Sequence, residues 1–225
     1  MKRVVILTGA GISAESGIKT FRDSDGLWEN YSIEEVCTAE ALTKNPKLVF
    51  EFYNQRRRDL LKAEPNWAHK GLVELEKKYD VQIITQNVDN LHERAGSSNI
   101  LHLHGELMKC RSMVHSDHIY DLSGPTLQYG EKGPDGTLLR PHIVFFNEAV
   151  PMIEPAIELV KSADILVIIG TSMVVYPAAG LLMYAKRDIP IYVIDPNIPH
   201  LSRGYNITAI EKKATEGVKE LLTLL

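Results

Sequence analysis

The chain has 225 residues, of which 44% are hydrophobic, and a formal net charge of -4 at pH 7. This length suits one large α/β domain with an insertion, or two small domains. The charge gives no electrostatic argument for nucleic acid or an anionic membrane, and no apolar run reaches the roughly eighteen residues of a membrane span. We therefore expect no nucleic-acid partner and no membrane partner.

The N-terminus and the cysteine count bear on the cellular location. The opening stretch MKRVVILTGAG is apolar only over a length too short for a signal peptide, and it runs directly into a glycine turn. Two cysteines, Cys37 and Cys110, cannot build a disulfide framework. We expect a cytoplasmic protein, and we expect it to be a monomer.

Short β-branched runs alternate with helical patterns along the chain. The predicted strands are Val4–Thr8, Val81–Thr85, Ile100–Leu103, Ile165–Ile169 and Ile191–Ile194, with a weaker one at Ile207–Ile210. The predicted helices are Ser32 to about Leu42, Pro46–Lys62, Asn66–Tyr79, Glu154–Ser162, Pro177–Arg187 and Thr215–Leu225. Ser32 with Glu35 fits a capping box, and Asn45 before Pro46 fits a helix start. This order predicts an α/β fold, a Rossmann-like doubly wound parallel sheet.

Two stretches do not fit the alternation of strands and helices. Residues 28–64 are helical between the first two strands, and residues 107–139 are polar with few strand signals. We expect both to leave the sheet and pack together as a smaller helical or irregular module inserted into the main domain. The predicted module comprises residues 31–65 and 106–139, and the predicted main domain comprises residues 1–30, 66–105 and 140–225.

A glycine-rich turn follows the first strand. The run Gly9-Ala10-Gly11-Ile12-Ser13-Ala14 matches the G-x-G-x-x-A pattern that brings a backbone close to phosphates, although a plain strand-to-helix turn is the alternative. A dehydrogenase needs a second strand that ends in an acidic residue about twenty residues later. That point falls in DSDGLWENY, which has no strand pattern, so hydride transfer is disfavoured. The long loop through Phe21 instead suggests closure over a ligand.

An amide, a carboxylate and imidazoles follow the next two strands. Asn87 and Asp89 lie just beyond a strand end, where open α/β sheets bind ligands. His102 and His104 alternate with leucines, so both face one way, and histidine suits proton transfer near neutral pH. The alternatives are that Asp89 or Asn90 only caps the following helix, and that the histidines are structural.

Two later turns also carry polar groups at strand ends. Gly170-Thr171-Ser172 offers hydroxyls and backbone N–H groups to a phosphate or ribose, and a plain turn is the alternative. Asp195 and Asn197 follow the next strand and suit a ribose diol, while an Asx-type turn is the alternative.

Taken together, five stretches resemble the sirtuins, the NAD-dependent protein-lysine deacylases. They are GAGISAESGIKTFR from Gly9, TQNVDNL from Thr85, HLHGE from His102, RPHIVFFNE from Arg140 and GTSMVVYPA from Gly170. They stand in the family's order and at its spacings, over nearly the whole chain. The resemblance implies an enzyme that binds NAD, releases nicotinamide and transfers the acyl group of a lysine to ADP-ribose.

The resemblance also implies roles for individual residues. His104 would act as general base on a ribose hydroxyl, Asn87 would bond ribose and water, and Asp89 would hold the nicotinamide carboxamide. The implied NAD-binding residues are Gly9, Ala10, Gly11, Ser13, Ile18, Phe21, Arg22, Gln86, Asn87, Asp89, Gly170, Thr171, Ser172, Asp195, Asn197 and Ala214. The partner would be an acyl-lysine protein or peptide that adds as a strand between two segments. The implied substrate residues are Tyr53, Arg56, Val144, Phe146, Asn147, Glu148, Val174, Val175 and Tyr176.

One pair points to the acyl group. Tyr53 and Arg56 are three apart in a predicted helix, so they share a face. Their spacing resembles that of the bacterial desuccinylase-type sirtuins, in which a phenol and a guanidinium grip an acyl carboxylate. We expect desuccinylase or demalonylase activity with some deacetylation retained. The alternative is that Tyr53 is core and the arginines form a solvated face.

Three positions depart from the family pattern. Lys19-Thr20 replaces the commonest pair there, and Asn147 stands where glycine is usual. The segment before Arg140 should carry four zinc cysteines and has only Cys110, so we expect a degenerate zinc-ribbon segment without structural zinc. A metal site that joins His115 and His118 to His102, His104 or Cys110 is the alternative.

Two other functional classes use the same nucleotide site. A protein ADP-ribosyltransferase or NAD glycohydrolase would transfer the ADP-ribose to another acceptor. The cleft determines which acceptor binds, so the phosphate-binding turn does not distinguish these classes. A nucleotide-binding sensor with little turnover is disfavoured because Asn87, Asp89 and His104 are all present.

Overall fold

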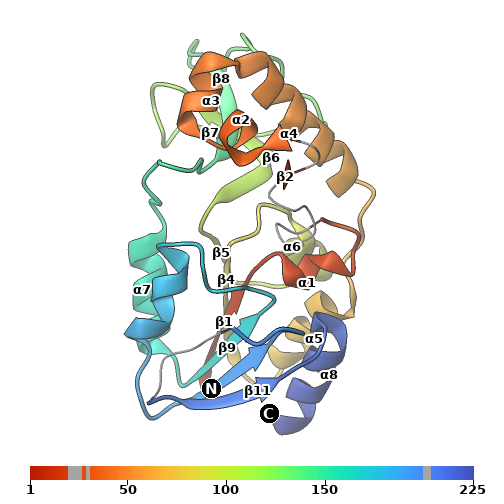
Figure 1. Ribbon diagram of the computed structural model, residues 1–225, viewed down its shortest axis with the longest axis vertical. Helices are drawn as coiled ribbons and strands as arrows, with labels where there is room; N and C mark the ends of the chain where they lie inside the picture. Colours follow the sequence, from red (N-terminus) through yellow and green to blue (C-terminus); the bar gives the residue numbers. More distant parts are fainter. Residues whose placement is uncertain (20–26, 29–30, 200–203) are drawn as a thin grey trace.

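The computed structural model describes residues 1–19, 27–28, 31–199 and 204–225. Its main body is a six-stranded parallel sheet in the order β11-β10-β9-β1-β4-β5 (Figure 1). The strands are β1 (Arg3–Thr8), β4 (Asp80–Thr85), β5 (Ile100–His102), β9 (Ile165–Ile169), β10 (Pro190–Ile194) and β11 (Asn206–Ile210). All six predicted strands are confirmed, the weaker one included. The order is that of a doubly wound Rossmann-like fold, with β1 and β9 adjacent where the winding reverses.

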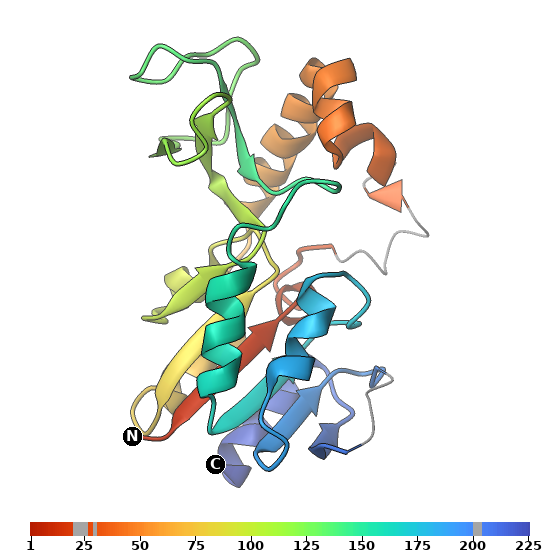
Figure 2. The ribbon, with the colours of Figure 1, turned by 90° about the vertical axis from the view of Figure 1, so that its left-hand side faces the viewer.

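Helices cover both faces of this sheet (Figure 2). Helix α7 (Ile153–Ser162) and the 3-10 helix η2 (Ala178–Tyr184) pack on one face, where they meet Val5 and Leu7 of β1. Helices α5 (Trp67–Leu75) and α8 (Ala214–Leu224) pack on the other face with the short α1 (Gly11–Ala14). Because neighbouring side chains of a strand point to opposite faces, a run such as VVIL is buried on both sides.

Several helix bounds differ from those predicted. The expected helix from Ser32 to Leu42 is two helices, α2 (Ile33–Val36) and α3 (Ala39–Lys44). Glu35 does accept from the Ser32 N–H, at 2.9 Å, but Thr38 then caps a new helix by accepting from the Ala41 N–H at 3.0 Å. Helix α4 (Pro46–Leu60) begins at the predicted proline. Helix α5 ends four residues before the predicted Tyr79, and residues 177–187 form only the 3-10 helix.

The prediction that residues 107–139 have little regular structure was wrong. They contribute to a three-stranded antiparallel sheet in the order β7-β6-β8, and a two-stranded ribbon joins β2 (Leu27–Trp28) to β3 (Tyr31–Ser32). The antiparallel strands are β6 (Gly105–Ser112), β7 (Ile119–Asp121) and β8 (Leu139–Ile143). In β6 two half-buried residues in succession, Met108 and Lys109, separate buried Leu107 from buried Cys110, and the register shifts between residues 105 and 110. This irregularity breaks the period-two pattern that identifies a strand.

The small module is held together by a polar network that begins on α4. Asn54 exchanges two hydrogen bonds with the backbone of Leu127, at 3.0 and 3.2 Å. Arg57 donates from Nε to the Leu107 carbonyl at 2.6 Å and from Nη1 to Asn54 Oδ1 at 2.7 Å. Arg57 is fully buried, and this burial lowers the pKa of its guanidinium to about 10. The helix thereby fixes the segment 106–139 at two points, and Phe50, Cys110 and Leu139 pack around Leu127.

We predict that this network, and not a structural zinc, stabilises the module. Asn54→Ala should lower the free energy of unfolding by roughly 2–4 kcal/mol, because it leaves the buried N–H and carbonyl of Leu127 and Nη1 of Arg57 without the partner that Asn54 provides. Gln55→Ala on the same helix is the matched control and should cost less than about 0.5 kcal/mol. Urea denaturation measures both variants, and treatment of the wild type with a chelator should leave its melting temperature unchanged. Stoichiometric zinc, lost on chelation with a large fall in melting temperature, would contradict the prediction.

Candidate active site

A cavity of about 750 Å³ lies at the carboxyl ends of the parallel strands and extends to the small module. Its lining includes these predicted residues: Gly9, Ala10, Gly11, Ile18, Gln86, Asn87, Asp89, His104, Gly170, Thr171, Ser172, Asp195, Asn197, Ala214, Tyr53, Arg56, Val144, Phe146, Asn147, Glu148, Val175 and Tyr176. Ser13 and Val174 do not line it, and Phe21 and Arg22 lie outside the described residues. The sequence analysis missed Cys37, which lines the cavity beside Tyr53.

The two glycine turns after β1 and β9 lie against each other. A Cβ on Gly9 would lie 2.7 Å from the Gly170 carbonyl oxygen, and Gly170 has a φ of +63°. The glycines are therefore needed for the contact between the turns. The N–H groups of Gly9, Gly11, Ile12 and Ser13 already donate to protein carbonyls. The turn thus shapes the cavity, and a phosphate that approaches it would be bound by groups other than these four paired amides.

Ser13 lies behind the cavity wall, where it organises two site residues. Its Oγ donates to Asp89 Oδ2 at 2.9 Å and accepts from Asn87 Nδ2 at 3.2 Å. Asn87 Nδ2 also donates to the Gly9 carbonyl at 3.1 Å. The Leu91 N–H donates to Asp89 Oδ1 at 3.1 Å, while the N-cap of α6 is Asn90, which makes no side-chain capping bond. Burial raises the pKa of Asp89, whose side chain still faces the cavity.

His104 presents one ring nitrogen to the cavity. Its Nδ1 lies 3.0 Å from the Gln86 carbonyl, which can only accept, so Nδ1 carries the proton. Burial lowers the pKa of His104 below its ordinary value of 6.5. The neutral ring therefore holds an unprotonated Nε2 at pH 7, which is the form that a general base requires.

Asp195 forms the Asx-type turn that was the alternative interpretation, and it also lines the cavity. Its Oδ1 accepts from the Asn197 N–H at 2.8 Å, which is an Asx-type turn. The turn places both residues at the end of β10, facing the cavity with Ala214 of α8.

Tyr53 and Arg56 of α4 reach the same cavity from the module. Tyr53 is 2% exposed and donates to Cys37 Sγ at 3.9 Å. Burial raises the pKa of Tyr53 well above its ordinary value and that of Cys37 to about 11, so both are neutral at pH 7. The Arg56 guanidinium lies 5.8 Å from the centre of the Phe52 ring. The alternative of a solvated arginine face is wrong for Arg57, which is fully buried, whereas Tyr53 does belong to a buried core cluster, as that alternative had it.

The segment after β8 forms the cavity wall opposite the glycine turns. Asn147 has a φ of +70°, a left-handed conformation that asparagine adopts more readily than most residues, which accounts for its place where glycine is usual. The Phe146 N–H donates to the Cys37 carbonyl at 2.8 Å, so this amide is already paired. Glu148 receives two hydrogen bonds from Arg140, at 2.6 and 3.1 Å, which fix the end of the segment.

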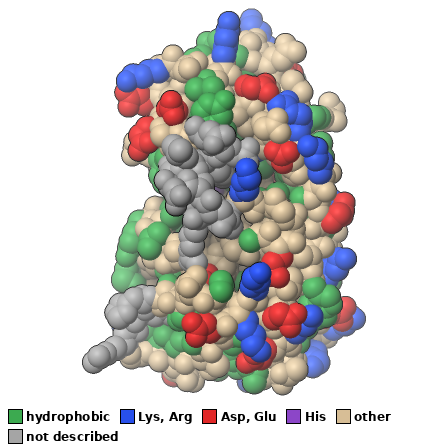
Figure 3. Space-filling model, turned by 45° about the vertical axis from the view of Figure 1, so that its right-hand side comes forward, with side chains coloured by type: hydrophobic (Ala, Val, Ile, Leu, Met, Phe, Trp, Pro, Cys, Tyr) green, Lys and Arg blue, Asp and Glu red, His purple; other side chains and the backbone are tan. Residues whose placement is uncertain are grey.

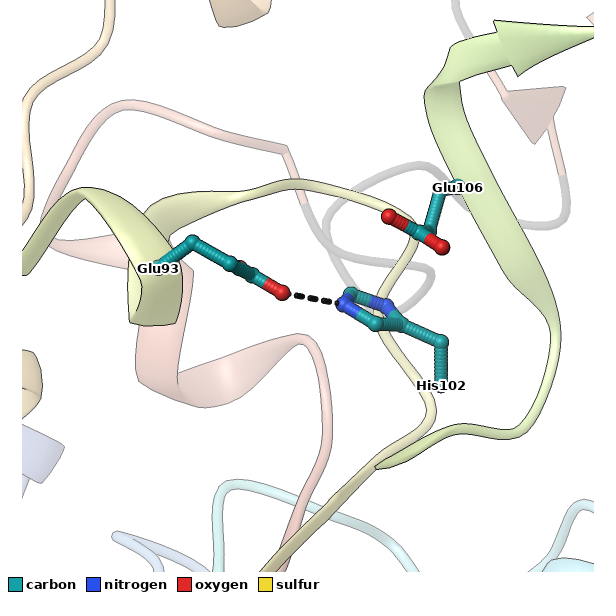
Figure 4. A group of neighbouring side chains, drawn as sticks. All are labelled: Glu93, His102 and Glu106. Atoms are coloured by element: carbon teal, nitrogen blue, oxygen red, sulfur yellow. Dashed lines mark hydrogen bonds and ion pairs between the residues drawn. The ribbon is translucent and has the colours of Figure 1, made fainter. Parts of the chain in front are cut away.

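In the described part of the chain, side chains of the types that can bind a metal lie close together at one place. Glu93, His102 and Glu106 bring their ligand atoms within 4.8 Å of one another (Figure 4). The metal alternative that uses His115 and His118 is not found among the described residues, since His118 instead pairs with Asp135 at 2.7 Å.

Comparisons with known proteins agree with this geometry. The model of the Sir2 family matches residues 9–177. An NAD-dependent protein deacylase of Aggregatibacter actinomycetemcomitans is 60% identical over 193 residues, which are 86% of this chain and 92% of the relative. A crystal structure of a Sir2 homologue with NAD has a TM-score of 0.89 at 39% identity, over 99% of this chain and 89% of that one. A Sir2 protein with a deacetylated peptide and an acetyl-ADP-ribose has a TM-score of 0.83 at 29% identity, over 98% and 92% of the two chains.

Two buried histidines beneath the cavity predict acid sensitivity. Burial lowers the pKa of His69 to about 4 and that of His92 well below its ordinary value. The unfolded chain binds protons on both below about pH 6.5 and the folded chain does not, so their contribution is present above that pH and lost as the pH falls. We expect the free energy of unfolding to fall by on the order of 2 kcal/mol per histidine between pH 7 and pH 5.

Urea denaturation of His69→Gln at the two pH values measures this contribution. The variant should lose less stability than the wild type between pH 7 and pH 5, and the exposed His115→Gln should behave like the wild type. Equal losses in His69→Gln and the wild type would show that His69 does not cause the acid sensitivity.

Proposed function

The chain belongs to the Sir2 family and is an NAD-dependent protein deacylase, and we propose that it prefers lysine acyl groups that end in a carboxylate. The observation that carries this proposal is that Tyr53 and Arg56 line the same cavity as Asn87, Asp89 and His104. A succinyl or malonyl group would then reach the module while its lysine amide lies near His104.

The charges at this end of the cavity support an acidic acyl group. Tyr53 and Cys37 are both neutral at pH 7, so neither side chain places a negative charge beside the Arg56 guanidinium. A guanidinium binds a carboxylate through two hydrogen bonds, and a phenol hydroxyl adds a third. Within the described part of the chain the Tyr53 hydroxyl donates to a sulfur at 3.9 Å, a weak bond that it would exchange at little cost for a bond to a carboxylate.

The residues around the cavity fit NAD. Two strand-end turns in close contact, a buried carboxylate, an amide and the Asp195–Asn197 turn face one space of about 750 Å³. When bound, NAD supplies the ribose carbon that accepts the acyl group as nicotinamide leaves. We assign the nicotinamide carboxamide to Asp89 with Ile18 as a wall, and the ribose to Asn87. We assign the pyrophosphate to the turns at residues 9–13 and 170–172. Ala214 would lie at the other end of the bound NAD.

His104 is assigned the role of general base. Its unprotonated Nε2 accepts a proton from a ribose hydroxyl, and the Gln86 carbonyl stabilises the imidazolium that results because it continues to accept from Nδ1. The lowered pKa keeps the base ready over the neutral range.

The substrate peptide is proposed to add as a strand between the segments at residues 146–148 and 174–176. The Phe146 N–H already donates to the Cys37 carbonyl and the Glu148 N–H to the Phe145 carbonyl, so the added strand would pair with other groups of this segment. Val144 then lines the lysine channel, and the exposed Tyr176 flanks the peptide from the other side.

We further propose cytoplasmic action as a monomer on protein substrates. Basic and acidic side chains are interspersed over the face in Figure 3, which does not favour a nucleic-acid partner on that face. None of the helices among the described residues is long and apolar enough to cross a membrane.

We predict that His104→Ala abolishes deacylation while the fold and NAD binding persist. Loss of a general base typically costs about two to four orders of magnitude in turnover. The experiment measures deacylation of the peptide by the variant and the wild type. It also measures the rate of nicotinamide release by the wild type with and without an acyl-lysine peptide, which shows whether NAD cleavage requires the peptide as acceptor. Near-normal deacylation by the variant would refute the role of His104. Peptide-free NAD cleavage as fast as cleavage with peptide would favour the glycohydrolase alternative.

We predict a higher kcat/KM for succinyl-lysine than for acetyl-lysine peptides. Arg56→Met and Tyr53→Phe should weaken succinyl-peptide binding about ten- to a hundredfold and affect acetyl peptide little, because only the acidic group uses both side chains. Arg58→Met is the matched control, since Arg58 pairs with Glu51 on the outer face of the same helix. Equal losses for both peptides would mean that Tyr53 and Arg56 are structural.

A further inference from the structure

Two histidines of the HLHGE segment hold two neighbouring carbonyls of the loop that carries the site. His104 Nδ1 lies 3.0 Å from the Gln86 carbonyl, and His102 Nδ1 lies 3.1 Å from the Asn87 carbonyl. The two rings differ in what their second nitrogen meets. Nε2 of His104 faces the cavity, whereas Nε2 of His102 lies 2.7 Å from a carboxylate oxygen of Glu93 on α6 (Leu91–Ala95), as Figure 4 shows.

His102 therefore meets an acceptor at each nitrogen. A carbonyl and a carboxylate can only accept, so both bonds exist together only when the ring carries two protons. A neutral ring satisfies one of them, and the proton stays with the stronger acceptor, the Glu93 carboxylate. Loss of one proton from His102 therefore releases the carbonyl of Asn87.

We propose that the Glu93–His102 pair is a positioning device that holds Asn87 in its catalytic orientation only while His102 is doubly protonated. Asn87 is anchored on its side-chain amide by Gly9 and Ser13 and on its carbonyl by His102. Without the His102 bond the Asn87 carbonyl loses its partner, and the side-chain amide and the Asn87 N–H, which donates to Thr85 Oγ1 at 3.1 Å, are the anchors that remain. His102 and Glu93 do not line the cavity, so they act through Asn87. This inference rests on the proposed role of Asn87 in the site.

The surroundings of His102 favour the protonated ring. Burial alone lowers the pKa of His102, but the hydrogen bond and charge of Glu93 and the charge of Glu106 outweigh it, and the net shift is upward. Lys109 pairs with Glu106 at 2.9 Å. The negative charges of Glu93 and Glu106 are therefore matched by the positive charges of protonated His102 and Lys109. A metal ion bound by Glu93, His102 and Glu106 would replace the proton on Nε2 of His102. We therefore interpret these three side chains as a charged pair with a neighbouring acid and not as a metal site. Asp89, His92 and His142 are the other titratable groups that interact with His102.

The pair predicts a particular pH dependence. Deacylation should fall on the acid side as His104 gains a proton and on the alkaline side as His102 loses one, above its ordinary value of 6.5. An acylated lysine does not titrate in this range, so the alkaline limb reports on the enzyme.

Glu93→Gln separates positioning from a structural role. Its carboxamide can donate to an unprotonated Nε2, so a neutral His102 then keeps its bond to Asn87 at every pH. We expect this variant to keep the acid limb and lose the alkaline limb of kcat/KM for an acetyl-lysine peptide. His102→Ala should lower kcat on the order of 10- to 100-fold at all pH values and also lack the alkaline limb. Arg94→Gln, the neighbouring residue on α6, is the control and should keep both limbs.

Nitrogen NMR of the His102 ring in protein without NAD gives a readout that does not depend on activity. We expect a doubly protonated ring at pH 7 in the wild type and a neutral ring in Glu93→Gln. A neutral wild-type ring, or an alkaline limb that persists unchanged in Glu93→Gln, would overturn the proposal. A wild type that deacylates no acyl-lysine peptide would instead refute the proposed function and leave the NMR result standing by itself.

Discussion

The site depends on one set of hydrogen bonds, in which four consecutive carbonyls, from the last residue of β4 through Val88, are held by residues 102–107. The carbonyl of Thr85 accepts from the Leu103 N–H at 2.9 Å, and the carbonyl of Val88 accepts from the Leu107 N–H at 2.7 Å. The two carbonyls between them accept from His104 and His102. Because the loop and the histidines fix each other, His104, Asn87 and Asp89 form one unit.

The same segment connects the sheet to the small module. Leu107 donates to the catalytic loop through its N–H and accepts from Arg57 of α4 through its carbonyl, so a single residue bonds both parts. The three consecutive arginines of α4 have different environments. Arg56 faces the cavity, Arg57 is buried in the network and Arg58 pairs with Glu51 on the outside, as successive residues of a helix point about 100° apart. The proposed acyl pocket therefore lies on the same helix as the Asn54–Arg57 network.

Much of the fold was predictable because the parallel strands are nearly all apolar and end in polar turns. The strand ends also placed Asn87, Asp89 and His104 at one edge of the sheet. The burial of Ser13 was not predictable, since a serine after a glycine turn suits a phosphate contact and a hydrogen bond to a distant carboxylate equally well. The hydrogen bonds of Arg57 could not be predicted from the sequence either. A buried guanidinium is rare, and only the tertiary fold brings Leu107 and Asn54 to it.

Amide hydrogen exchange at Leu103 and Leu107, in protein without NAD, tests this account most directly. If the loop and the histidine segment form one prebuilt unit, both amides should exchange only on global unfolding, with the same free energy as the core amide of Ile6 in β1. Exchange at Leu103 and Leu107 that is orders of magnitude faster than at Ile6, and slowed only by NAD, would contradict it. The site would then be assembled by its ligand, and the hydrogen bonds described here would not determine its geometry.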